Sequence, residues 1–414
     1  MPNCFGIGKN ANISRADPRA AIRACENHRR LLSVSLVCCT FLFSGCAISP
    51  EDTVQTHVFQ TLWSSPVQVT HITLPGQYTN VQSAAGYVWA TQAGLFSPKT
   101  IKIEQKSNEI TELPRPGSEV PDFLVDENSI WYTDGTTLSK VDIETNLVTT
   151  TIQGAGIPFA LGDGSVWTYN RNTQIVSGID AITNQIRTQL PTHGRPYHPG
   201  SFAYGAGSIW QFAYIGNVTM WQDLNIYAPA LASVVRRIDP NTNKVIAEIP
   251  VGLFTNIVDA GASTDRIHFV AGAIWILGRS AEETFSSPSH KVPFVKRIDV
   301  ETNRVTATIL LDTTFIAATE KNNWCGSYRK PQTPVFLDGG LWISVYCGRA
   351  QSELLKINIK TNQIAGAFTL YAPGIFEPVG MFRGTGFLLT HPELTVTGDS
   401  LWGFDGHNAI RVDF

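Results

Sequence analysis

A short pattern of polar and apolar residues recurs seven times along the chain and ends each time in a tryptophan. Gly, Asn or Asp comes first, one further residue follows, and Val, Ile or Leu then stands directly before the tryptophan. The seven tryptophans are Trp89, Trp131, Trp167, Trp210, Trp275, Trp342 and Trp402. Because turn residues followed by apolar and aromatic residues are typical of a hairpin strand, each copy predicts a strand that carries the tryptophan.

A second motif follows six of these tryptophans and ends in Asn. The clear copies begin with an apolar residue and then Asp or Asn, and they occupy residues 141–146, 179–184, 238–243, 298–303 and 357–362, with a weaker copy at residues 103–108. Asp and Asn side chains accept bonds from their own backbone, and Asn tolerates the left-handed conformation that closes a tight turn. Each copy therefore predicts a hairpin between two further strands.

Each unit thus contains four predicted strands, and the shorter units repeat at a period of roughly 40 residues, as propeller blades do. A single blade cannot bury both faces of its sheet, so neighbouring blades must cover it. We therefore predict an all-β fold over residues 67–414, a seven-bladed β-propeller of four-stranded blades. We expect each recurrent tryptophan to pack between two sheets.

The seventh unit ends after its third predicted strand, at residues 410–414. Residues 67–75 look like an isolated fourth strand, because they alternate and end in Leu-Pro as the other fourth strands end in Leu-Pro or Ile-Pro. We expect this N-terminal strand to complete the last blade, which joins the two ends of the ring and removes an exposed sheet edge.

The blade spacing and the two motifs resemble the seven-bladed YVTN-type propellers and the streptogramin-lyase (virginiamycin B lyase) propellers. The resemblance covers residues 67–414, although the YVTN tetrapeptide itself is absent. Streptogramin lyases use a His and acidic residues with magnesium at the propeller face, so the resemblance implies a lyase as one possible activity. No stretch matches beyond the blade pattern, and no residue role is carried over.

The N-terminal region has the features of an export signal. Two arginines precede an apolar run, residues 31–43, which is too short to span a bilayer and fits a signal-peptide core. Residues 43–46, Phe-Ser-Gly-Cys, resemble the lipobox of bacterial lipoproteins, which implies a diacylated Cys46 as the mature N-terminus. The alternative is an ordinary cleaved signal peptide.

These features divide the chain into a leader over residues 1–45, a lipidated tether over residues 46–66 and the propeller. Ala47 follows the cysteine, whereas Asp there is the inner-membrane retention signal in many Gram-negative bacteria. The expected location is therefore the bacterial cell envelope, at the outer membrane facing the periplasm. Contact with the membrane is expected through the lipid anchor alone.

The charge of the chain argues against nucleic acid as a partner. The formal net charge is −3, and the first 45 residues contain six Lys or Arg and two Asp or Glu, so the remainder carries −7. A mildly acidic body lacks the electrostatic footprint of a protein that holds phosphate backbones. The expected partners are a protein, a glycan or a small ligand.

Inserts lengthen the last four units, at residues 211–233, 276–294, 312–334 and 371–392. Because strand direction alternates within a blade, all four should emerge on the same face of the disc. Cys325 and Cys347, the only cysteines after Cys46, are predicted at this face. An exported compartment permits a disulfide between them, and two unpaired buried thiols are the alternative.

Polar and aromatic residues predicted at or near this face are the candidate ligand-binding residues. They are Arg195, Tyr197, His198, Trp221, Asp265, Arg279, Arg349, His391, Glu393 and His407. A His and carboxylates in one concavity can bind a divalent metal or act as acid and base, and solvated rim charges explain the same set. Loops held on a rigid scaffold commonly bind ligands.

Two functions fit this sequence. The first is a non-enzymatic envelope lipoprotein that binds a ligand or partner through the face with the inserts, without a cofactor. The alternative is a metal-assisted lyase or hydrolase of a small substrate at the channel mouth, with magnesium or calcium held near His198, Asp265 and Glu393.

Overall fold

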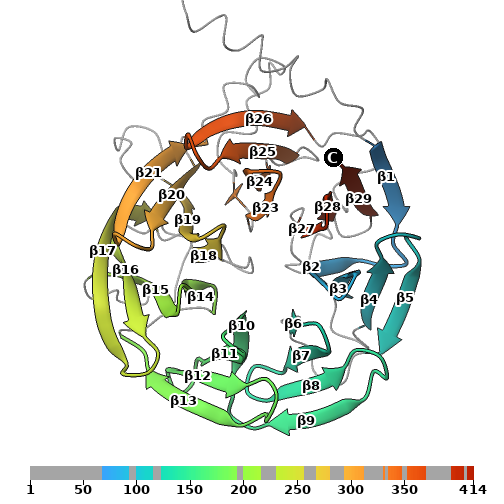
Figure 1. The fold of residues 1–414 in the computed structure, drawn as a ribbon, viewed down its shortest axis with the longest axis horizontal. Helices are drawn as coiled ribbons and strands as arrows, with labels where there is room; N and C mark the ends of the chain where they lie inside the picture. Colours follow the sequence, from blue (N-terminus) through green and yellow to red (C-terminus); the bar gives the residue numbers. More distant parts are fainter. Residues whose placement is uncertain are drawn as a thin grey trace, which may run out of the picture. The chain divides into compact units, whose positions relative to one another are not determined.

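A computed structural model describes residues 68–92, 99–114, 123–193, 199–215, 230–255, 267–279, 293–311, 330–331, 334–346, 352–369, 393–404 and 408–414. In these ranges seven antiparallel sheets form a ring around a central axis, as the repeats predict (Figure 1). One short 3-10 turn, Pro199–Ser201, interrupts the strands. No helix in the described ranges is long and apolar enough to cross a membrane.

Each blade runs from an inner strand beside the axis to an outer strand on the circumference. Blade 1 consists of β2 (Tyr78–Ala84), β3 (Tyr87–Gln92), β4 (Lys99–Glu104) and β5 (Ile110–Pro114), and blade 2 of β6 (Phe123–Val125), β7 (Ser129–Thr133), β8 (Leu138–Asp142) and β9 (Val148–Ile152). Blade 3 consists of β10 (Ile157–Gly162), β11 (Ser165–Asn170), β12 (Ile175–Asp180) and β13 (Ile186–Pro191). Blade 4 consists of β14 (Phe202–Gly205), β15 (Ser208–Tyr214), β16 (Ala230–Asp239) and β17 (Lys244–Thr255).

The remaining blades carry the segments that the sequence predicts as inserts. Their strands are β18 (Ile267–Val270), β19 (Ala273–Arg279), β20 (Pro293–Asp299) and β21 (Arg304–Leu310) in blade 5; β22 (Lys330–Pro331), β23 (Val335–Leu337), β24 (Gly340–Tyr346), β25 (Ser352–Asn358) and β26 (Gln363–Thr369) in blade 6; and β27 (Glu393–Thr397), β28 (Ser400–Phe404), β29 (Asn408–Asp413) and β1 (Gln68–Thr73) in blade 7.

The predicted bounds of three inserts are wrong, because the strands that flank them are longer than expected. The ladder of β15 and β16 continues to the pair Tyr214 and Ser233, inside the predicted insert 211–233. Likewise, β19 and β20 pair as far as Arg279 and Pro293, inside the predicted insert 276–294. Part of the predicted insert 312–334 forms β22, which pairs with β24. The predicted insert 371–392 lies outside the described residues.

The N-terminal strand closes the ring, as predicted. β1 pairs antiparallel with β29, from Gln68 opposite Asp413 to Thr73 opposite Asn408 (Figure 1). It therefore supplies the outer strand that the seventh unit lacks. The backbone groups on that side of β29 are paired and present no open edge.

The apolar core is divided into seven clusters, and each cluster lies between two consecutive blades. Each cluster contains one recurrent tryptophan, none more than 4% exposed. The expected packing of tryptophan between sheets is thus confirmed. A buried indole supplies a large apolar surface, so each blade is stabilised mainly by its neighbours.

The indole N–H also has a repeated partner. In five blades it donates to an oxygen of the residue five positions earlier, at the start of the turn between the first and second strands. Trp210, for example, donates to the Gly205 carbonyl at 3.0 Å, and Trp342 donates to the Leu337 carbonyl at 3.1 Å. In blade 2 the Asp126 carboxylate, also five positions earlier, accepts the bond from Trp131 at 2.8 Å. Each bond holds the indole ring against the turn of its own blade. It also gives an acceptor to a buried N–H that would be costly to leave without one.

The second motif forms the predicted turns between third and fourth strands. The final Asn of every copy has a positive φ, between 53° and 61°. The leading side chain accepts backbone N–H bonds within the turn, as Asp142 does from Thr145 at 2.8 Å and Asn358 from Lys360 at 2.9 Å. The turn is therefore shaped by its own side chains before any neighbour contacts it.

A Lys or Arg joins the tryptophan of one blade to the turn of the second motif in the next blade. In six blades a basic residue of the third strand lies opposite the tryptophan, namely Lys102, Lys140, Arg237, Arg297, Lys356 and Arg411. The Arg237 guanidinium lies 5.0 Å from the centre of the Trp210 ring, within the range of a cation–π contact. It also donates to the Val300 carbonyl at 2.6 Å, in the turn of the next blade.

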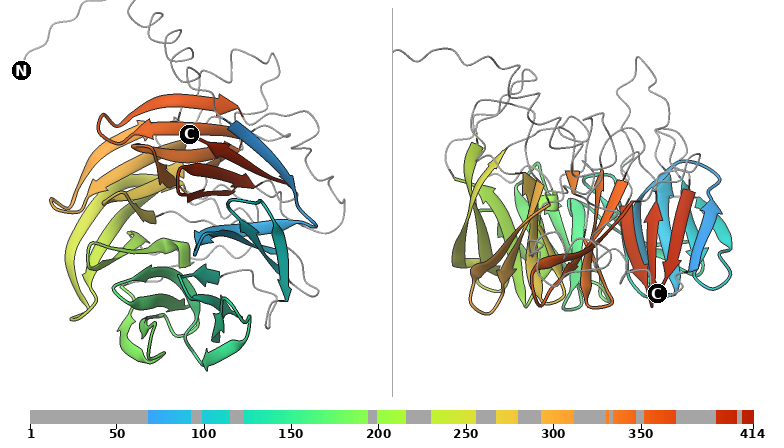
Figure 2. Two further views of the ribbon diagram at one scale, coloured as in Figure 1. Left: turned by 45° about the vertical axis from the view of Figure 1, so that its right-hand side comes forward. Right: turned by 90° about the horizontal axis from the view of Figure 1, so that it is seen from above.

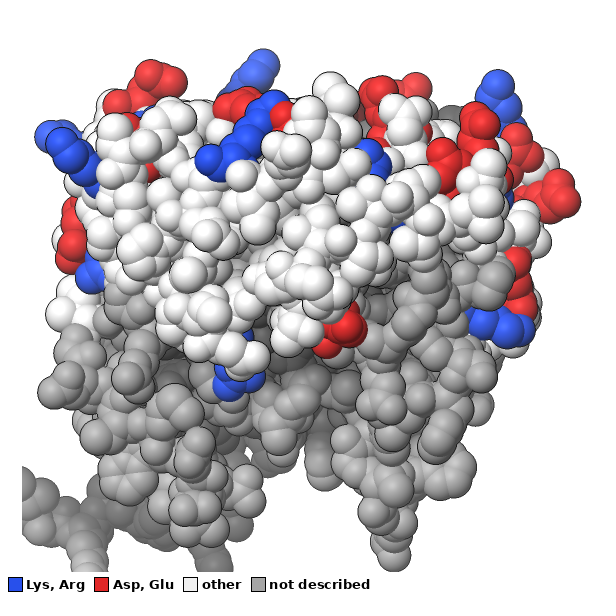
Figure 3. All heavy atoms as spheres, turned by 90° about the horizontal axis from the view of Figure 1, so that it is seen from below, with Lys and Arg blue, Asp and Glu red and all other residues white. Residues whose placement is uncertain are grey.

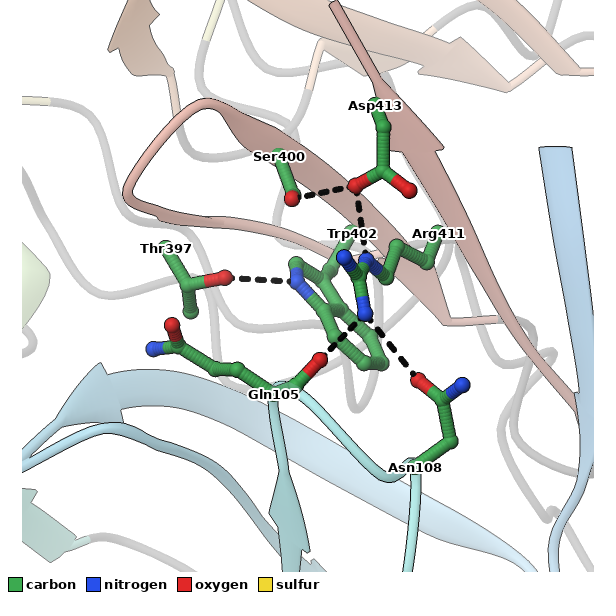
Figure 4. Close-up of polar contacts among 7 residues, drawn as sticks. All are labelled: Gln105, Asn108, Thr397, Ser400, Trp402, Arg411 and Asp413. Atoms are coloured by element: carbon green, nitrogen blue, oxygen red, sulfur yellow. Dashed lines mark hydrogen bonds and ion pairs between the residues drawn. The ribbon is translucent and has the colours of Figure 1, made fainter. Parts of the chain in front are cut away.

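The same bridge recurs at three other interfaces. Figure 4 shows it between blades 7 and 1, where Arg411 lies against Trp402 and donates to the Gln105 carbonyl and the Asn108 side chain. Lys140 reaches the Ala181 carbonyl at 2.6 Å, and Arg297 reaches the Ile359 carbonyl at 3.3 Å. Tryptophan, cation and neighbouring turn thus form an interblade bridge, which the sequence interpretation missed.

Blades 1, 3 and 6 depart from this bridge. In blade 1 the Lys102 ammonium lies over the Tyr87 ring, 4.9 Å from its centre, rather than over Trp89. Gly178 stands opposite Trp167, and a Cβ there would meet the indole ring at 2.9 Å. The ring instead stacks on Tyr204 of blade 4, with centroids 4.8 Å apart. In blade 6 the next blade has no turn to reach, since its third and fourth strands come from opposite ends of the chain, and Phe414 packs 5.2 Å from Trp342.

The turn carboxylates predict how stability depends on pH. Backbone N–H donors hold the pKa of Asp142, Asp180, Asp239 and Asp299 below the ordinary value of 3.8. Because folding favours the charged form, their contribution is present above pH 3.8 and is lost as the pH falls toward the folded pKa. We predict that replacing all four by Asn, the residue blade 6 has at position 358, reduces the fall in unfolding temperature between about pH 5 and pH 3.

The control removes Glu144 and Glu301, exposed carboxylates of the same turns, as Gln variants. Thermal unfolding at both pH values should show the wild-type acid loss in this control. An equal acid loss in the fourfold Asn variant would contradict the assignment.

Candidate functional site

The two rims of the ring differ in how they connect strands. On one, here called the turn rim, first and second strands and third and fourth strands meet in tight turns such as Ala206–Gly207 and Asp239–Asn243. The other, the loop rim, joins second to third strands and each blade to the next. Figure 2 shows the hairpin turns together at one edge of the ring.

The long connections all begin and end at the loop rim, because the strands alternate in direction. They comprise residues 215–229, 256–266, 280–292, 311–329 and 370–392, between the ends of paired strands in blades 4 to 7. Blades 2 and 3 instead have short loop-rim connections, such as residues 134–137 and 171–174. The predicted concentration of longer segments on one face, over blades 4 to 7, thus agrees with the strand ends.

Most candidate residues lie outside the described part of the chain. These are Arg195, Tyr197, His198, Trp221, Asp265, Arg349, His391 and His407, together with Cys46, Cys325 and Cys347. Their roles, the lipidation and the disulfide remain predictions. Arg279 is described by its backbone and forms the last residue of β19, opposite Pro293, at the loop rim.

Glu393 is the candidate whose side chain is described, and it joins two inner strands. It is the first residue of β27, and its carboxylate accepts the Val81 N–H of β2 at 2.7 Å. Nearby, the Ser83 hydroxyl donates to the Val396 carbonyl at 2.6 Å. Blades 7 and 1 are therefore tied together at their inner strands, with Glu393 as one of the ties.

A backbone irregularity in β2 makes this contact possible. Asn80 has a φ of 54°, and the pairing of β2 with β3 shifts between Thr79 and Gln82. Such a bulge turns the following N–H out of the ladder, which frees Val81 to reach a carboxylate of the next blade. Sequence reasoning could not find this contact, because it depends on the register of β2.

Gln82 makes the corresponding link between blades 1 and 2. Its amide donates to the Phe123 carbonyl, and its Oε1 accepts the Val125 N–H at 3.1 Å. One side chain therefore pairs with β6 as a backbone peptide unit would. Side-chain bonds thus join the inner strands of three consecutive blades.

His193 anchors the start of the connection that carries Arg195, Tyr197 and His198. Its carbonyl accepts a bond from the Arg236 guanidinium and another from the Gln211 side chain at 3.2 Å. Gln211 is fully buried in blade 4. The connection therefore begins at a point fixed to the next blade and ends at the 3-10 turn before β14.

Two buried tyrosines are the most strongly shifted titratable groups described. Burial, reinforced by the Glu112 carboxylate, raises the pKa of Tyr78 to about 12. Burial also raises the pKa of Tyr204, whose hydroxyl donates to Asp163 at 2.6 Å. Both tyrosines stay protonated at neutral pH, and the Tyr204 hydroxyl acts as a hydrogen-bond donor rather than as a base.

Two further features of the described residues bear on ligand and metal binding. A cavity of about 400 Å³ lies where the end of β1 meets β5, lined by Thr73, Leu74, Pro75, Ile110 and Glu112. Its carboxylate already pairs with Lys99. No group of three or more His, Cys, Asp or Glu in the described ranges is placed to hold a metal ion.

No protein-family model and no curated protein matches this sequence. Among solved structures, the chain is similar to Kuenenia stuttgartiensis hydrazine synthase, with 12% identity, coverage of 83% of this chain and 98% of that chain, and a TM-score of 0.55. It is also similar to the Neurospora crassa Pan2 WD40 domain, with 11% identity, 83% and 94% coverage, and a TM-score of 0.50.

BamB from Moraxella catarrhalis is a third similar structure, with 12% identity, 84% and 98% coverage, and a TM-score of 0.45. At such low identities the likeness shows the propeller fold alone.

The anchor at His193 predicts a measurable local effect. Replacing Arg236 by Met keeps the aliphatic stem but removes the guanidinium donor, so the segment should open more often. We predict that amide hydrogen exchange over residues 192–201 accelerates by about tenfold, as expected when a charged hydrogen bond is lost.

The matched control is Glu248→Gln, which removes the exposed partner of Arg236 and leaves the bond to His193. Exchange in this variant should stay at the wild-type rate. Unchanged exchange in the Met variant would show that Arg236 does not hold the segment.

Proposed function

We propose that this chain is a non-enzymatic binding propeller of the bacterial cell envelope, held at the membrane by a lipid on Cys46, which presents its loop rim to a partner. The observation that carries the proposal is the difference between the two rims. Short turns close the turn rim, whereas connections as long as residues 370–392 leave the loop rim. Long connections on a stiff scaffold are a common basis for recognition.

The scaffold supports this role because contacts between neighbouring blades stiffen the ring that carries the loop rim. Interblade bridges, side-chain ties between inner strands and the anchored His193 all limit relative movement of the blades. A surface whose supports are fixed loses less conformational entropy on binding than one that must first be ordered.

A protein is the favoured partner among the classes that the sequence allows. The strand ends that bracket the long connections are spread over blades 4 to 7, which is a broad area. The hollow between β1 and β5 lies elsewhere, and its one carboxylate is paired with Lys99. A glycan or a small ligand would require a deeper site with several convergent polar groups.

Site-specific photo-crosslinking in cells tests the choice of rim. A photoreactive amino acid is placed at Trp221 or Phe285 in the long connections, and in separate chains at Glu301 or Lys360 on the turn rim. We predict crosslinked adducts of defined mass from the first pair and none from the second, because the partner contacts the loop rim.

Adducts from Glu301 and Lys360 alone would contradict the proposal. So would a rise of several degrees in the unfolding temperature of residues 47–414 on addition of magnesium or calcium, since a bound ion stabilises the folded state. That second outcome would favour the metal-assisted lyase or hydrolase.

A further inference from the structure

Four large apolar side chains are exposed at or beside the turns between the third and fourth strands of blades 2 and 3. Leu147 and Val148, at the start of β9, are 65% and 46% exposed, and Ile182 and Ile186, around the start of β13, are 85% and 39% exposed. We call these four residues the blade 2–3 patch. Single exposed apolar residues are common, but a group of large ones indicates an interaction surface.

The other blades provide an internal reference for this patch. The place of Ile182, third in the turn, is taken elsewhere by Lys106, Glu144, Asn241, Glu301 and Lys360. The place of Leu147, directly after the turn, is taken by Glu109, Gln185, Lys244, Arg304 and Gln363. The fold therefore accepts polar residues at both places, and the two apolar residues are not needed to form the turn.

The contacts between blades 2 and 3 place the turn that carries Ile182 against β8 and β9 of blade 2. The Asn184 side chain donates to the Thr150 hydroxyl of β9 at 3.3 Å. Lys140 of β8 donates to the Ala181 carbonyl in the same turn. The turn with Ile182 thus rests on the strand that begins with Val148, two residues before Thr150.

Strand β9 of blade 2 is uncharged, whereas carboxylates outnumber cations at the turn rim beside it. β9 reads Val-Thr-Thr-Thr-Ile, and Figure 3 shows charged side chains along one rim above a wall that is largely without them. The carboxylates of blades 2 and 3 at the turn rim are Asp126, Glu127, Asp142, Glu144, Asp163 and Asp180. The cations there are Lys140 and Arg187, of which Arg187 pairs with Asp180.

We propose that the blade 2–3 patch docks a basic amphipathic segment of a partner protein. Apolar side chains of the partner would cover Leu147 and Ile182, and flanking Lys or Arg would face the acidic rim. Such an arrangement buries apolar area at the centre and places opposite charges at the border, as protein interfaces do.

Charge makes this occupant fit better than two others. A second copy of the chain would bring the same carboxylates against this rim in a two-fold contact, and like charges in register repel. An anionic bilayer surface would be repelled by the same carboxylates. The inference does not depend on the loop rim, because the patch lies at the opposite rim and on blades without long connections.

Binding of a defined peptide tests the proposal on the propeller as it exists. The probe is a fluorescent synthetic peptide of alternating Leu and Lys, with a Leu and Glu peptide as its charge-reversed counterpart. The test variant combines Leu147→Gln and Ile182→Asn, residues that sibling blades carry at these places. We expect the Leu and Lys peptide to bind the wild type, and the double variant to bind it about tenfold more weakly.

A matched control keeps the loss specific to the patch. Ile246→Asn with Leu310→Gln removes two side chains that are 53% and 55% exposed on other blades, and should leave affinity unchanged. Glu144→Lys, which copies Lys360 of blade 6, should weaken binding as well, because it reverses one rim charge. The Leu and Glu peptide should not bind.

Several results would overturn the proposal. These are equal affinity of the double variant and the wild type, equal weakening in the matched control, or equal binding of both peptides. If the wild type sediments as a dimer and the double variant as a monomer, the patch is assigned to contact with a second copy. If the wild type floats with phosphatidylglycerol vesicles and the double variant does not, the patch is assigned to contact with a membrane.

Discussion

The packing of a tryptophan between neighbouring blades is the contact on which the ring depends, and at four interfaces a cation extends it to the neighbouring turn. A four-stranded blade has two apolar faces and cannot bury them alone, so its stability comes from its neighbours. The tryptophan supplies the apolar area, and the cation crosses from its ring to a carbonyl of the next turn, as Arg237 does to Val300. That carbonyl is correctly placed because Asp299 has already shaped the turn through its own backbone bonds. Local turn chemistry thus prepares the long-range contact.

The sequence was sufficient for the architecture, because both motifs recur and each has a local physical cause. The number of blades, the closing strand and the interblade tryptophans all follow from them. The basic residue of the interblade bridge was missed. Lys140, Arg237 and Arg411 each stand directly before an Ile or Val and an Asp, and this repetition could have indicated it. Insert bounds failed at Tyr214 and Ser233, because a hairpin can continue past the last repeated residue when its ladder stays paired.

The candidate site was harder to predict than the fold, since repeats specify the scaffold and not what it binds. Glu393 lies on the inner strand β27, but its bond to Val81 arises from the bulge at Asn80, which no periodicity signals. Departures from the repeat carry more information. Gly178 marks the interface without a cation, and Leu147 and Ile182 mark apolar residues where sibling blades are polar. Comparing equivalent positions of the blades finds all three without a structure. The two proposed surfaces then lie on opposite rims of one stiff ring, an arrangement suited to holding two partners at once.

The unfolding free energy of a single variant tests the central claim about the bridge most directly. Arg237→Leu keeps the apolar stem over Trp210 but removes the bond to Val300, and Arg304→Leu removes an exposed arginine at the start of β21. Denaturant unfolding should show a loss of about 2 kcal/mol for the first and less than about 0.5 kcal/mol for the second. Equal and small losses in both variants would contradict the claim that these bridges hold the ring together.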